Sequence, residues 1–373
     1  MKVICNRGAL VEALGVVGTA VVARTPKPVL QCIRLDADNE GGNAYLTLSA
    51  TDLEIAVRYT NTHVDVQTPG STLLPADKLQ AIVRESVDDT LSIELVDKQA
   101  VIKGADSEFK IFTQDPKDFP EVPTFEGDPD FSVAGGPLRQ LIHQTLFAAA
   151  REGTRYAFNG TLVLIDNGDL TFVTTDGRRL ALARTPVSGD AKAKKDKAPD
   201  PIVPTKAMSL VDKLVGDPEE MVGIQLRDNR ILVHTADATL TSNLVEGTFP
   251  PFRDVIPKDN DKAMTAATAD FLSAVRRASL LTNEESKGVR MHFKDGGLEL
   301  SSRNPDSGEA KVNFACNYEG DEVEIGFNPQ FLESALKVVD TDEVRFELSA
   351  ANRPGLLKAG EGFLYVIMPV NLQ

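Results

Sequence analysis

The sequence has little of the chemistry that metal-binding and disulfide-stabilised proteins use. Its 373 residues include only three cysteines and four histidines. Cys5, Cys32 and Cys316 are far apart and lack the paired spacing of a disulfide framework or a zinc site. We therefore expect three reduced cysteines that pack in the interior, and neither a metal ion nor a cofactor.

Long apolar runs are also missing. Nowhere do 18 apolar residues follow one another, as a membrane-spanning helix requires. The opening residues MKVICNRGALVEAL lack the apolar stretch of a secretion signal. These features predict a cytoplasmic protein. The chain exceeds the roughly 100 to 200 residues of an ordinary domain, which favours two or three domains.

The histidines form no catalytic pattern. His63, His143, His234 and His292 fall in different predicted elements or repeats, without ligand spacing. The sequence also lacks a glycine-rich phosphate-binding loop, and the Thr-Asp-Gly order at 175–177 is not the Asp-Thr-Gly of aspartic proteases. We therefore predict a protein that is not an enzyme. A hydrolase with paired carboxylates is the minor alternative, because the chain contains 55 acidic residues; turnover by the pure protein would support it.

What the sequence does contain is a threefold repeat. TTDGRRLAL at 174–182 has counterparts in SATDLEIAV at 49–57 and SRNPDSGEA at 302–310. Other landmarks recur at similar intervals, and self-similarity at a fixed period indicates a repeated architecture. The sequence therefore predicts three homologous domains, 1–127, 128–258 and 259–373. The recurring landmarks are Asp52, Asp176 and Asp306; Pro75, Pro204 and Pro329; and Leu10, Leu138 and Leu272.

Each domain is expected to be α+β, with two helices packed on antiparallel sheet. Helical and alternating apolar spacings occur in the same order in each repeat. Hairpin turns are predicted at Asp38-Asn39 and Thr51-Asp52, and a type I′ turn at Asp176-Gly177, where Arg178 and Arg179 open the next strand. Residues 188–201 have no periodicity and predict an exposed loop. The predicted helices are 7–24, 75–86, 137–151, 204–216, 270–282 and 328–340.

Charge is distributed unevenly between these elements. The chain has a net charge of −15, yet the predicted helices hold eleven basic against seven acidic residues, which leaves −19 for the rest. Basic helices gathered on one side would attract a polyanion such as duplex DNA regardless of its base sequence. The alternative is that each basic residue only forms part of a solvated helix face and binds nothing. The basic residues that the helices contribute to this prediction are Arg139, Lys206, Lys213, Arg276, Arg277 and Lys337.

Several segments, taken in order, resemble the bacterial DNA polymerase III beta subunits, the sliding clamp family. The resemblance covers essentially the whole chain. The segments are TDLEIAV, RYAFNG, TTDGRRLAL, LVEGTFPPFRDVIP, TNEESKGVR, EIGFNPQFL and YVIMPVNL. The resemblance implies a non-catalytic ring that encircles DNA, made of two chains joined head to tail, with helices lining the hole and sheets forming the rim. It also implies Arg24, Lys78, Arg151, Arg155 and Tyr156 as DNA contacts.

The resemblance further implies a pocket on the second and third domains that receives short peptides from the replicative polymerase, the clamp loader and repair proteins. The chain has Arg178 where histidine is common and Asn371 where arginine is usual, and Gln373 extends its end, so these positions bear on peptide preference. The residues carried over by position are Phe158, Thr175, Gly177, Arg178, Arg179, Leu180, Pro250, Val255, Asn328, Phe331, Asn352, Pro354, Val366, Met368, Pro369, Val370, Asn371 and Leu372.

The contact between the two chains is predicted at Leu280 and Leu281. These adjacent leucines end a helix outside the register of the core-facing Phe271, Val275 and Ala278, which leaves apolar surface in need of a partner. A scaffold that binds proteins but not DNA is the second alternative, because it would explain both a peptide pocket and the acidic balance.

Overall fold

A computed structural model describes the chain except for residues 151–155, 167, 188–199, 228, 283–287 and 372–373. The chain folds into two compact units, which we describe separately. The first comprises Met1–Gly136 and Ser209–Leu244, and the second comprises Pro137–Val187 and Val245–Gln373. The described part of Ala191–Met208 belongs to the second unit. The predicted loop 188–201 lies almost entirely outside the described residues.

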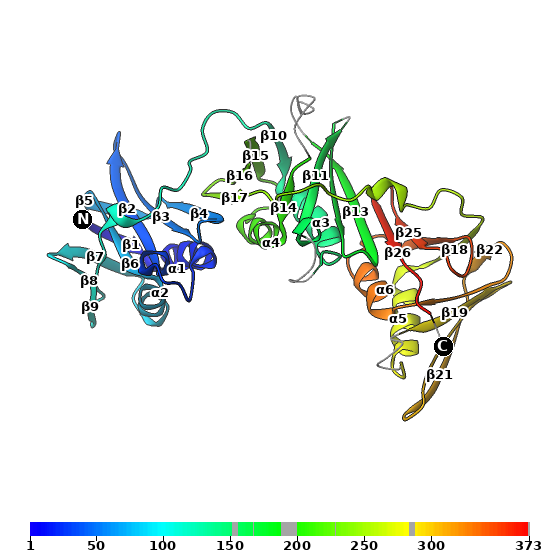
Figure 1. Cartoon of the computed structure of the whole chain (residues 1–373). Coiled ribbons are helices and arrows are strands. Elements are labelled where there is room, and N and C mark those ends of the chain that lie inside the picture. The colour runs from blue at the N-terminus through cyan, green and yellow to red at the C-terminus, as the bar shows by residue number, and fades with distance from the viewer. Residues whose placement is uncertain (151–155, 167, 188–199, 228, 283–287, 372–373) are drawn as a thin grey trace. The chain divides into compact units, whose positions relative to one another are not determined.

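A similar order of helices and strands occurs three times along the chain, as the sequence predicts, with one strand fewer between the helices of the second repeat among the described residues (Figure 1). The first repeat contains β1 (Lys2–Asn6), α1 (Arg7–Val17), β2 (Cys32–Glu40), β3 (Asn43–Thr51), β4 (Ile55–Asn61), β5 (Val64–Thr68), β6 (Gly70–Pro75), α2 (Ala76–Glu85), β7 (Thr90–Val96), β8 (Gln99–Lys103) and β9 (Glu108–Phe112). The second contains β10 (Phe131–Ala134), α3 (Gly135–Leu146), β11 (Gly160–Asp166), β12 (Asp169–Thr175), β13 (Arg179–Pro186), β14 (Ile202–Pro204), α4 (Thr205–Leu214), β15 (Met221–Arg227), β16 (Arg230–His234) and β17 (Ala238–Asn243). The third contains β18 (Lys262–Ala267), α5 (Thr268–Ser279), β19 (Val289–Lys294), β20 (Gly297–Asn304), β21 (Gly308–Phe314), β22 (Asn317–Glu319), β23 (Val323–Phe327), α6 (Pro329–Leu336), β24 (Glu343–Leu348), β25 (Gly355–Ala359) and β26 (Phe363–Ile367).

Strand pairing joins each repeat to the next. The first unit has a sheet in the order β5-β1-β7-β8-β9 and a second in the order β10-β15-β16-β17-β4-β3-β2-β6. The second unit has sheets β14-β11-β12-β13-β26-β25-β24-β18-β22 and β21-β20-β19-β23. All of the pairs between the named strands are antiparallel. Pairs β17–β4 and β13–β26 therefore continue the sheet from one repeat into another.

Helix α1 forms because its apolar residues follow helical spacing and its first turn is capped. In α1, the Asn6 side chain accepts a hydrogen bond from the Ala9 amide, which satisfies one of the free N–H groups of the first turn. Leu10, Ala13, Leu14 and Val17 then form one buried stripe. The predicted extension of this helix to residue 24 is wrong. Helix α1 ends at Val17, and a short 3₁₀ turn follows from Gly18.

Two side chains hold α1 and α2 together. The guanidinium of Arg7 donates to the carbonyl oxygens of Val83 and Arg84 at 3.0 and 2.8 Å, which satisfies free carbonyls at the C-terminal end of α2. In the other direction, Gln80 donates to the carbonyl of Leu14 at 2.9 Å. The first repeat thus has two helices on antiparallel sheet, as predicted.

The third repeat has an aromatic core centred on Phe346. Its ring lies 6.3 Å from that of Phe271 on α5, 6.2 Å from Phe293 and 5.5 Å from Phe327, measured between centroids. Such spacings stabilise aromatic pairs beyond their burial alone. Gly355 is required beside this core, because a Cβ there would lie 2.6 Å from the Phe346 ring.

One predicted hairpin turn lies elsewhere and another is of a different type. Strands β2 and β3 turn at Gly41-Gly42, not at Asp38-Asn39, because both glycines adopt the positive φ that a type I′ turn demands. At Asp176-Gly177 only the glycine has positive φ, so the type I′ prediction is wrong, and β13 begins at Arg179.

Side-chain hydrogen bonds close the turn between β12 and β13. Thr175 Oγ1 donates to the Arg179 carbonyl at 2.6 Å and accepts from the Gly177 amide at 3.1 Å. Asp176 Oδ1 accepts from the amides of Arg178 and Arg179 at 2.9 and 3.0 Å.

The turn between β3 and β4 repeats this network residue for residue. Thr51 Oγ1 donates to the Ile55 carbonyl and accepts from the Leu53 amide, while Asp52 Oδ1 accepts from the amides of Glu54 and Ile55. The predicted turn at Thr51-Asp52 is therefore confirmed. Leu53 occupies the place of the glycine with φ of 80°, a conformation that costs a non-glycine residue free energy.

Two of the three cysteines are buried, as predicted, and Cys316 is half-buried. Cys5, Cys32 and Cys316 are free, and burial raises the pKa of the first to about 12 and of the other two to about 11. They are thiols that pack in the protein.

In the part of the chain that the structure describes, no helix is long and apolar enough to cross a membrane.

The strained leucine provides a test of the turn. We expect Leu53→Gly to raise the free energy of unfolding by about 0.5 to 1 kcal/mol, because glycine tolerates positive φ and this gain outweighs its extra entropy in the unfolded chain. The reciprocal change Gly177→Leu should lower it by about 1 kcal/mol or more. Urea unfolding curves of both variants provide the measurement. A Leu53→Gly protein less stable than wild type would show that the leucine side chain stabilises the turn by more than its positive φ costs.

Candidate functional site

The turn at 175–179 lies beside the last strand of the chain. Leu180 pairs with Val366 and Arg179 with Ile367 in the β13–β26 ladder. Where the ladder ends, the Met368 amide still donates to the Arg178 carbonyl at 2.9 Å. The C-terminal residues thus follow the edge of this turn, and the sequence-predicted residues of both segments come together.

Arg179 is held in place from several sides. Its Nε lies 3.1 Å from Asp176 Oδ2, and its terminal nitrogen donates to the Phe147 carbonyl at 2.7 Å. Its guanidinium carbon lies 4.4 Å from the centre of the Phe331 ring and 5.5 Å from that of Phe147, within range of a cation–π interaction. Arg179 therefore stabilises the turn, whereas the neighbouring Arg178 is exposed and available to a ligand.

Tyr365 lies beneath this arginine. Its hydroxyl donates to the Phe331 carbonyl at 3.0 Å, and its ring centre is 5.6 Å from that of Phe147. Burial raises the pKa of the phenol above its usual range, although Arg179 opposes the change. The hydroxyl is thus neutral and acts as a buried donor.

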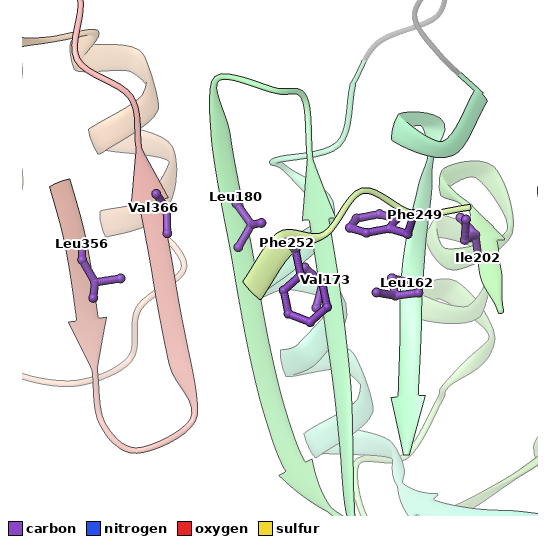
Figure 2. Close-up of a cluster of buried hydrophobic side chains, with 8 residues drawn as sticks. All are labelled: Leu162, Val173, Leu180, Ile202, Phe249, Phe252, Leu356 and Val366. Atoms are coloured by element: carbon purple, nitrogen blue, oxygen red, sulfur yellow. The ribbon is translucent and has the colours of Figure 1, made fainter. Parts of the chain in front are cut away.

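A hydrophobic cluster lies under the turn and the C-terminal strand. Figure 2 shows Leu180 and Val366 on neighbouring strands, with Phe249 and Phe252 on the segment that crosses over the sheet. The rings of these phenylalanines meet edge to face at 6.3 Å. The cluster consists of Leu162, Val173, Leu180, Ile202, Phe249, Phe252, Leu356 and Val366.

Exposed apolar side chains lie around this cluster. Met368 is 42% exposed at the end of β26, and Val255 is 48% exposed three residues after the buried Phe252. Phe158 lies near Gly177, where an added Cβ would be 3.8 Å from its ring. Met368 and Phe158 thus place apolar side chains next to the turn that carries the exposed, charged Arg178.

The remaining residues predicted to bind peptide lie in caps, turns and loop segments. Asn328 caps α6, since its side chain accepts from the Gln330 amide at 2.9 Å. Pro354 precedes Gly355, which pairs with Ile367, so Pro354 lies near Met368, while Asn352 is exposed in the turn before it. Leu372 lies outside the described residues. The other predicted residues are partly buried or exposed; they are Pro250 in the crossing segment and Pro369, Val370 and Asn371 near the C-terminus.

Sequence reasoning missed the residues that support the turn. Asp176 was predicted as a landmark of the repeat and as a turn residue, but not as a support of Arg179, yet its carboxylate binds two amides and Arg179. Phe147 and Phe252 also escaped notice. The Thr-Asp pair that recurs in the first repeat was the available signal for Asp176, but the sequence offers none for Phe147, which is 32 residues from the arginine that it contacts.

The predicted basic residues lie on or next to the helices. Lys78 is on α2, Arg139 on α3, Lys206 and Lys213 on α4, Arg276 and Arg277 on α5, and Lys337 caps α6. Most of these side chains are exposed, and Arg139 is half-buried. Arg24 is exposed after the 3₁₀ turn that follows α1. Arg151 and Arg155 lie outside the described residues, and of Tyr156 only the backbone, in a 3₁₀ turn, is described.

Glu333 links the basic residues of the third repeat. Its carboxylate lies 3.6 Å from Arg276 and 3.2 Å from Lys337. One acid therefore holds two cations of α5 and α6 in place and leaves the group with net positive charge. Ion pairs of exposed arginine and lysine side chains contribute little to stability, so the pairing with Glu333 does not prevent Arg276 and Lys337 from binding a phosphate.

Apolar side chains are exposed at two sheet edges. Leu280 is 78% exposed after α5, whereas Leu281 is half-buried beside Gly308 at the start of edge strand β21. In the first unit, edge strand β9 exposes Phe109 and Phe112, the latter by 74%. Free strand edges bearing apolar residues are prone to pair with another chain.

The described residues offer no sign of metal chemistry. Among them, no group of three or more His, Cys, Asp or Glu side chains is arranged to hold a metal ion. His234 lies 3.0 Å from the hydroxyl of Thr239, and His292 pairs with Glu322. These contacts explain both histidines without a catalytic role.

Comparison with known proteins agrees with the sequence and the fold. Models of the N-terminal, central and C-terminal domains of the DNA polymerase III beta subunit match residues 1–123, 132–251 and 253–371. The beta sliding clamp of Pseudomonas aeruginosa is 34% identical over 370 residues, which cover 98% of this chain and 99% of that protein. A crystal structure of the DNA polymerase sliding clamp from Pseudomonas aeruginosa covers 100% of both chains with a TM-score of 0.91 and 31% identity. That from Bacillus subtilis also covers 100% of both, with a TM-score of 0.92 and 27% identity. The chain therefore belongs to the family of DNA polymerase III beta subunits, the beta sliding clamps.

Proposed function

We propose that two copies of this chain join head to tail into a ring that encircles duplex DNA and tethers the replicative polymerase. The family consists of non-catalytic processivity factors of DNA replication. The observation that supports the proposal most directly is the threefold repeat, which is matched over its whole length by three consecutive clamp domains. We propose domain boundaries after residues 127 and 258.

The exposed sheet edges support closure of the ring. An edge strand with unpaired backbone groups gains hydrogen bonds when a second strand joins it. Strand β9 of the first repeat and strand β21 of the third are both such edges. A head-to-tail contact would pair β9 of one chain with β21 of the other and cover Phe112 and Leu280 together. Two such contacts close a dimer without a free edge at either seam.

The charge distribution supports sequence-independent DNA binding. Basic residues on the helices attract phosphates, while the acidic remainder repels them and orients the approach. Retention by topology needs no tight contact, and weak contacts that carry no sequence information permit sliding. The same arrangement argues against a scaffold that binds only proteins, because protein binding alone does not require basic residues on the helices.

The surface around Arg178 and Met368 supports peptide binding. It combines exposed apolar side chains, a flexible methionine that adapts to several shapes, and a turn fixed by the clamped Arg179. We propose that it receives short peptide segments of the polymerase, the clamp loader and repair proteins. Arg178 then interacts with the acidic or carbonyl groups of the peptide, because Arg179 is already occupied by Asp176 and Phe147.

We expect Leu280→Asp, and likewise Leu281→Asp, to yield monomers. Either change places a carboxylate in an apolar seam, where burial of an unpaired charge is unfavourable. Leu280 is the sharper test, because the half-buried Leu281 also packs within its own domain. Sedimentation velocity at low concentration measures the outcome, with Met221→Asp, an exposed apolar site in the second repeat, as the control. Dimers that persist in Leu280→Asp would place the seam elsewhere.

We expect the wild-type chain, once loaded, to stay on circular DNA and to leave when the circle is cut. Binding to linear duplex should be weak. The slope of log affinity against log salt concentration should become shallower by about 0.9 for each phosphate contact removed. The double change Arg276→Glu and Arg277→Glu should slow loading without unfolding the protein, whereas Lys98→Glu, in a turn of the sheet, should not. Retention that survives linearisation, or selective binding to one base sequence, would contradict the ring.

We expect Met368→Ala combined with deletion of residues 370–373 to abolish most of the peptide affinity. A leucine or phenylalanine of the peptide gains about 1.5 to 3 kcal/mol when it is buried on this surface, and a few anchors carry most binding energy. Anisotropy of a fluorescent polymerase-tail peptide measures the loss, with Met221→Ala as the matched control. Sedimentation confirms that the dimer is intact, and unchanged affinity in an intact dimer would remove the C-terminus from the site.

A further inference from the structure

The turn that follows α3, residues 147–150, contacts the candidate peptide surface at two places. The Arg179 guanidinium donates to the Phe147 carbonyl at 2.7 Å, and the Ala150 amide donates to the Phe158 carbonyl at 3.0 Å. Arg179 and Phe158 are both among the residues predicted to bind peptide. The turn therefore holds two of these residues, although it was not itself predicted to take part in binding.

The end of helix α3 fixes the position of Phe147. The Thr145 hydroxyl donates to the Leu141 carbonyl at 2.7 Å, and the Ala148 amide donates to the Thr145 carbonyl at 3.0 Å. The hydroxyl of Thr174, on β12, donates to the same carbonyl. The last carbonyls of a helix have no partner within it, so these bonds close the end of α3. Phe147 thus follows a helix end that is tied to the strand leading into the 175–179 turn.

Arg179 depends on fixed partners because it is largely buried. Its side chain is 13% exposed, and a charged group taken out of water needs acceptors for its donors. Asp176 and the Phe147 carbonyl accept from it, while the ring centres of Phe331 and Phe147 lie 4.4 and 5.5 Å from the guanidinium carbon. Tyr365 supports both rings, since its hydroxyl donates to the Phe331 carbonyl and its ring lies 5.6 Å from that of Phe147. Phe147 therefore gives Arg179 both an acceptor and an aromatic ring.

The first repeat shows that this arrangement is not needed to form the turn. Its own turn has the same four side-chain hydrogen bonds, yet Ile55 stands at the position of Arg179. The interval between the first helices of the two repeats places Thr19 at the position of Phe147. The first repeat thus has neither the arginine nor the aromatic ring at these positions. The pair accompanies the turn that presents Arg178, which points to a role in binding and not in the common framework.

We propose that Phe147 is a positioning residue of the peptide surface. Its carbonyl oxygen and ring hold the Arg179 guanidinium, which in turn holds the Asp176 carboxylate. The turn fixed in this way presents the exposed Arg178 and the carbonyl that accepts from the Met368 amide. The inference rests on the proposed peptide binding and adds a residue that acts on the peptide through Arg179.

The test is anisotropy of the fluorescent polymerase-tail peptide with the full chain. Phe147→Leu keeps the carbonyl but removes the ring, and we expect it to weaken the peptide about three- to tenfold. Phe147→Tyr keeps the ring and should recover most of the affinity. Arg179→Gln should weaken the peptide at least as much as Phe147→Leu does. The double variant should be no weaker than Arg179→Gln alone, because two residues that act through one contact are not additive.

Phe293→Leu, in the aromatic core of the third repeat, is the matched control. It should lower the unfolding temperature and leave the peptide affinity unchanged, so that loss of stability is distinguished from loss of positioning. Unchanged affinity in Phe147→Leu, no recovery in Phe147→Tyr, or additive losses in the double variant would overturn the positioning role while leaving the peptide surface in place. A wild-type chain that binds no peptide would overturn the peptide surface itself and this inference with it.

Discussion

Backbone pairing between consecutive repeats is the constraint on which the rest of the structure depends. β26 of the third repeat pairs with β13 of the second, and β17 of the second pairs with β4 of the first. Each ladder is antiparallel, so its register fixes which residues leave the sheet at its end. In the second unit, the register places Met368 against Arg178, and the candidate peptide surface begins where this ladder stops.

The two ladders end in the same way but produce different surfaces. In the first unit the Asn243 amide donates to the Glu54 carbonyl, just as Met368 does to Arg178. The turns also share all four side-chain hydrogen bonds. The difference lies in the side chains that this framework carries. The first repeat has Leu53, Glu54 and a buried Ile55 where the second has Gly177, Arg178 and Arg179. A common framework thus carries a specialised site in only one of these two turns.

Much of the fold follows from sequence patterns, because periodicity and repetition are local. Helix positions were predicted correctly from the spacing of residues such as Leu10 and Leu14, and the repeat gave their order. The predicted turn at Asp38-Asn39 was wrong because Asp and Asn are common turn residues, yet only the glycines at 41 and 42 tolerate two successive positive φ values. Helix ends were predicted too long for a related reason, since a C-terminal boundary depends on one residue such as Gly18.

The candidate sites could be predicted only where the residues adjoin a motif. Arg178, Met368 and the basic helix residues stand in recognisable segments, so sequence and resemblance sufficed to name them. Phe331 was named from the resemblance and Phe147 was not, but the contact of either ring with Arg179 depends on packing between residues far apart in the chain. A polar cavity beside α1, lined by Glu12, Tyr59 and Asp237 among others, is a further case. Asp237 follows Tyr59 by 178 residues in the sequence, and the β17–β4 pairing of Ala238 with Tyr59 brings them together. The same ladder that joins two repeats therefore also creates a charged cavity that neither repeat has by itself.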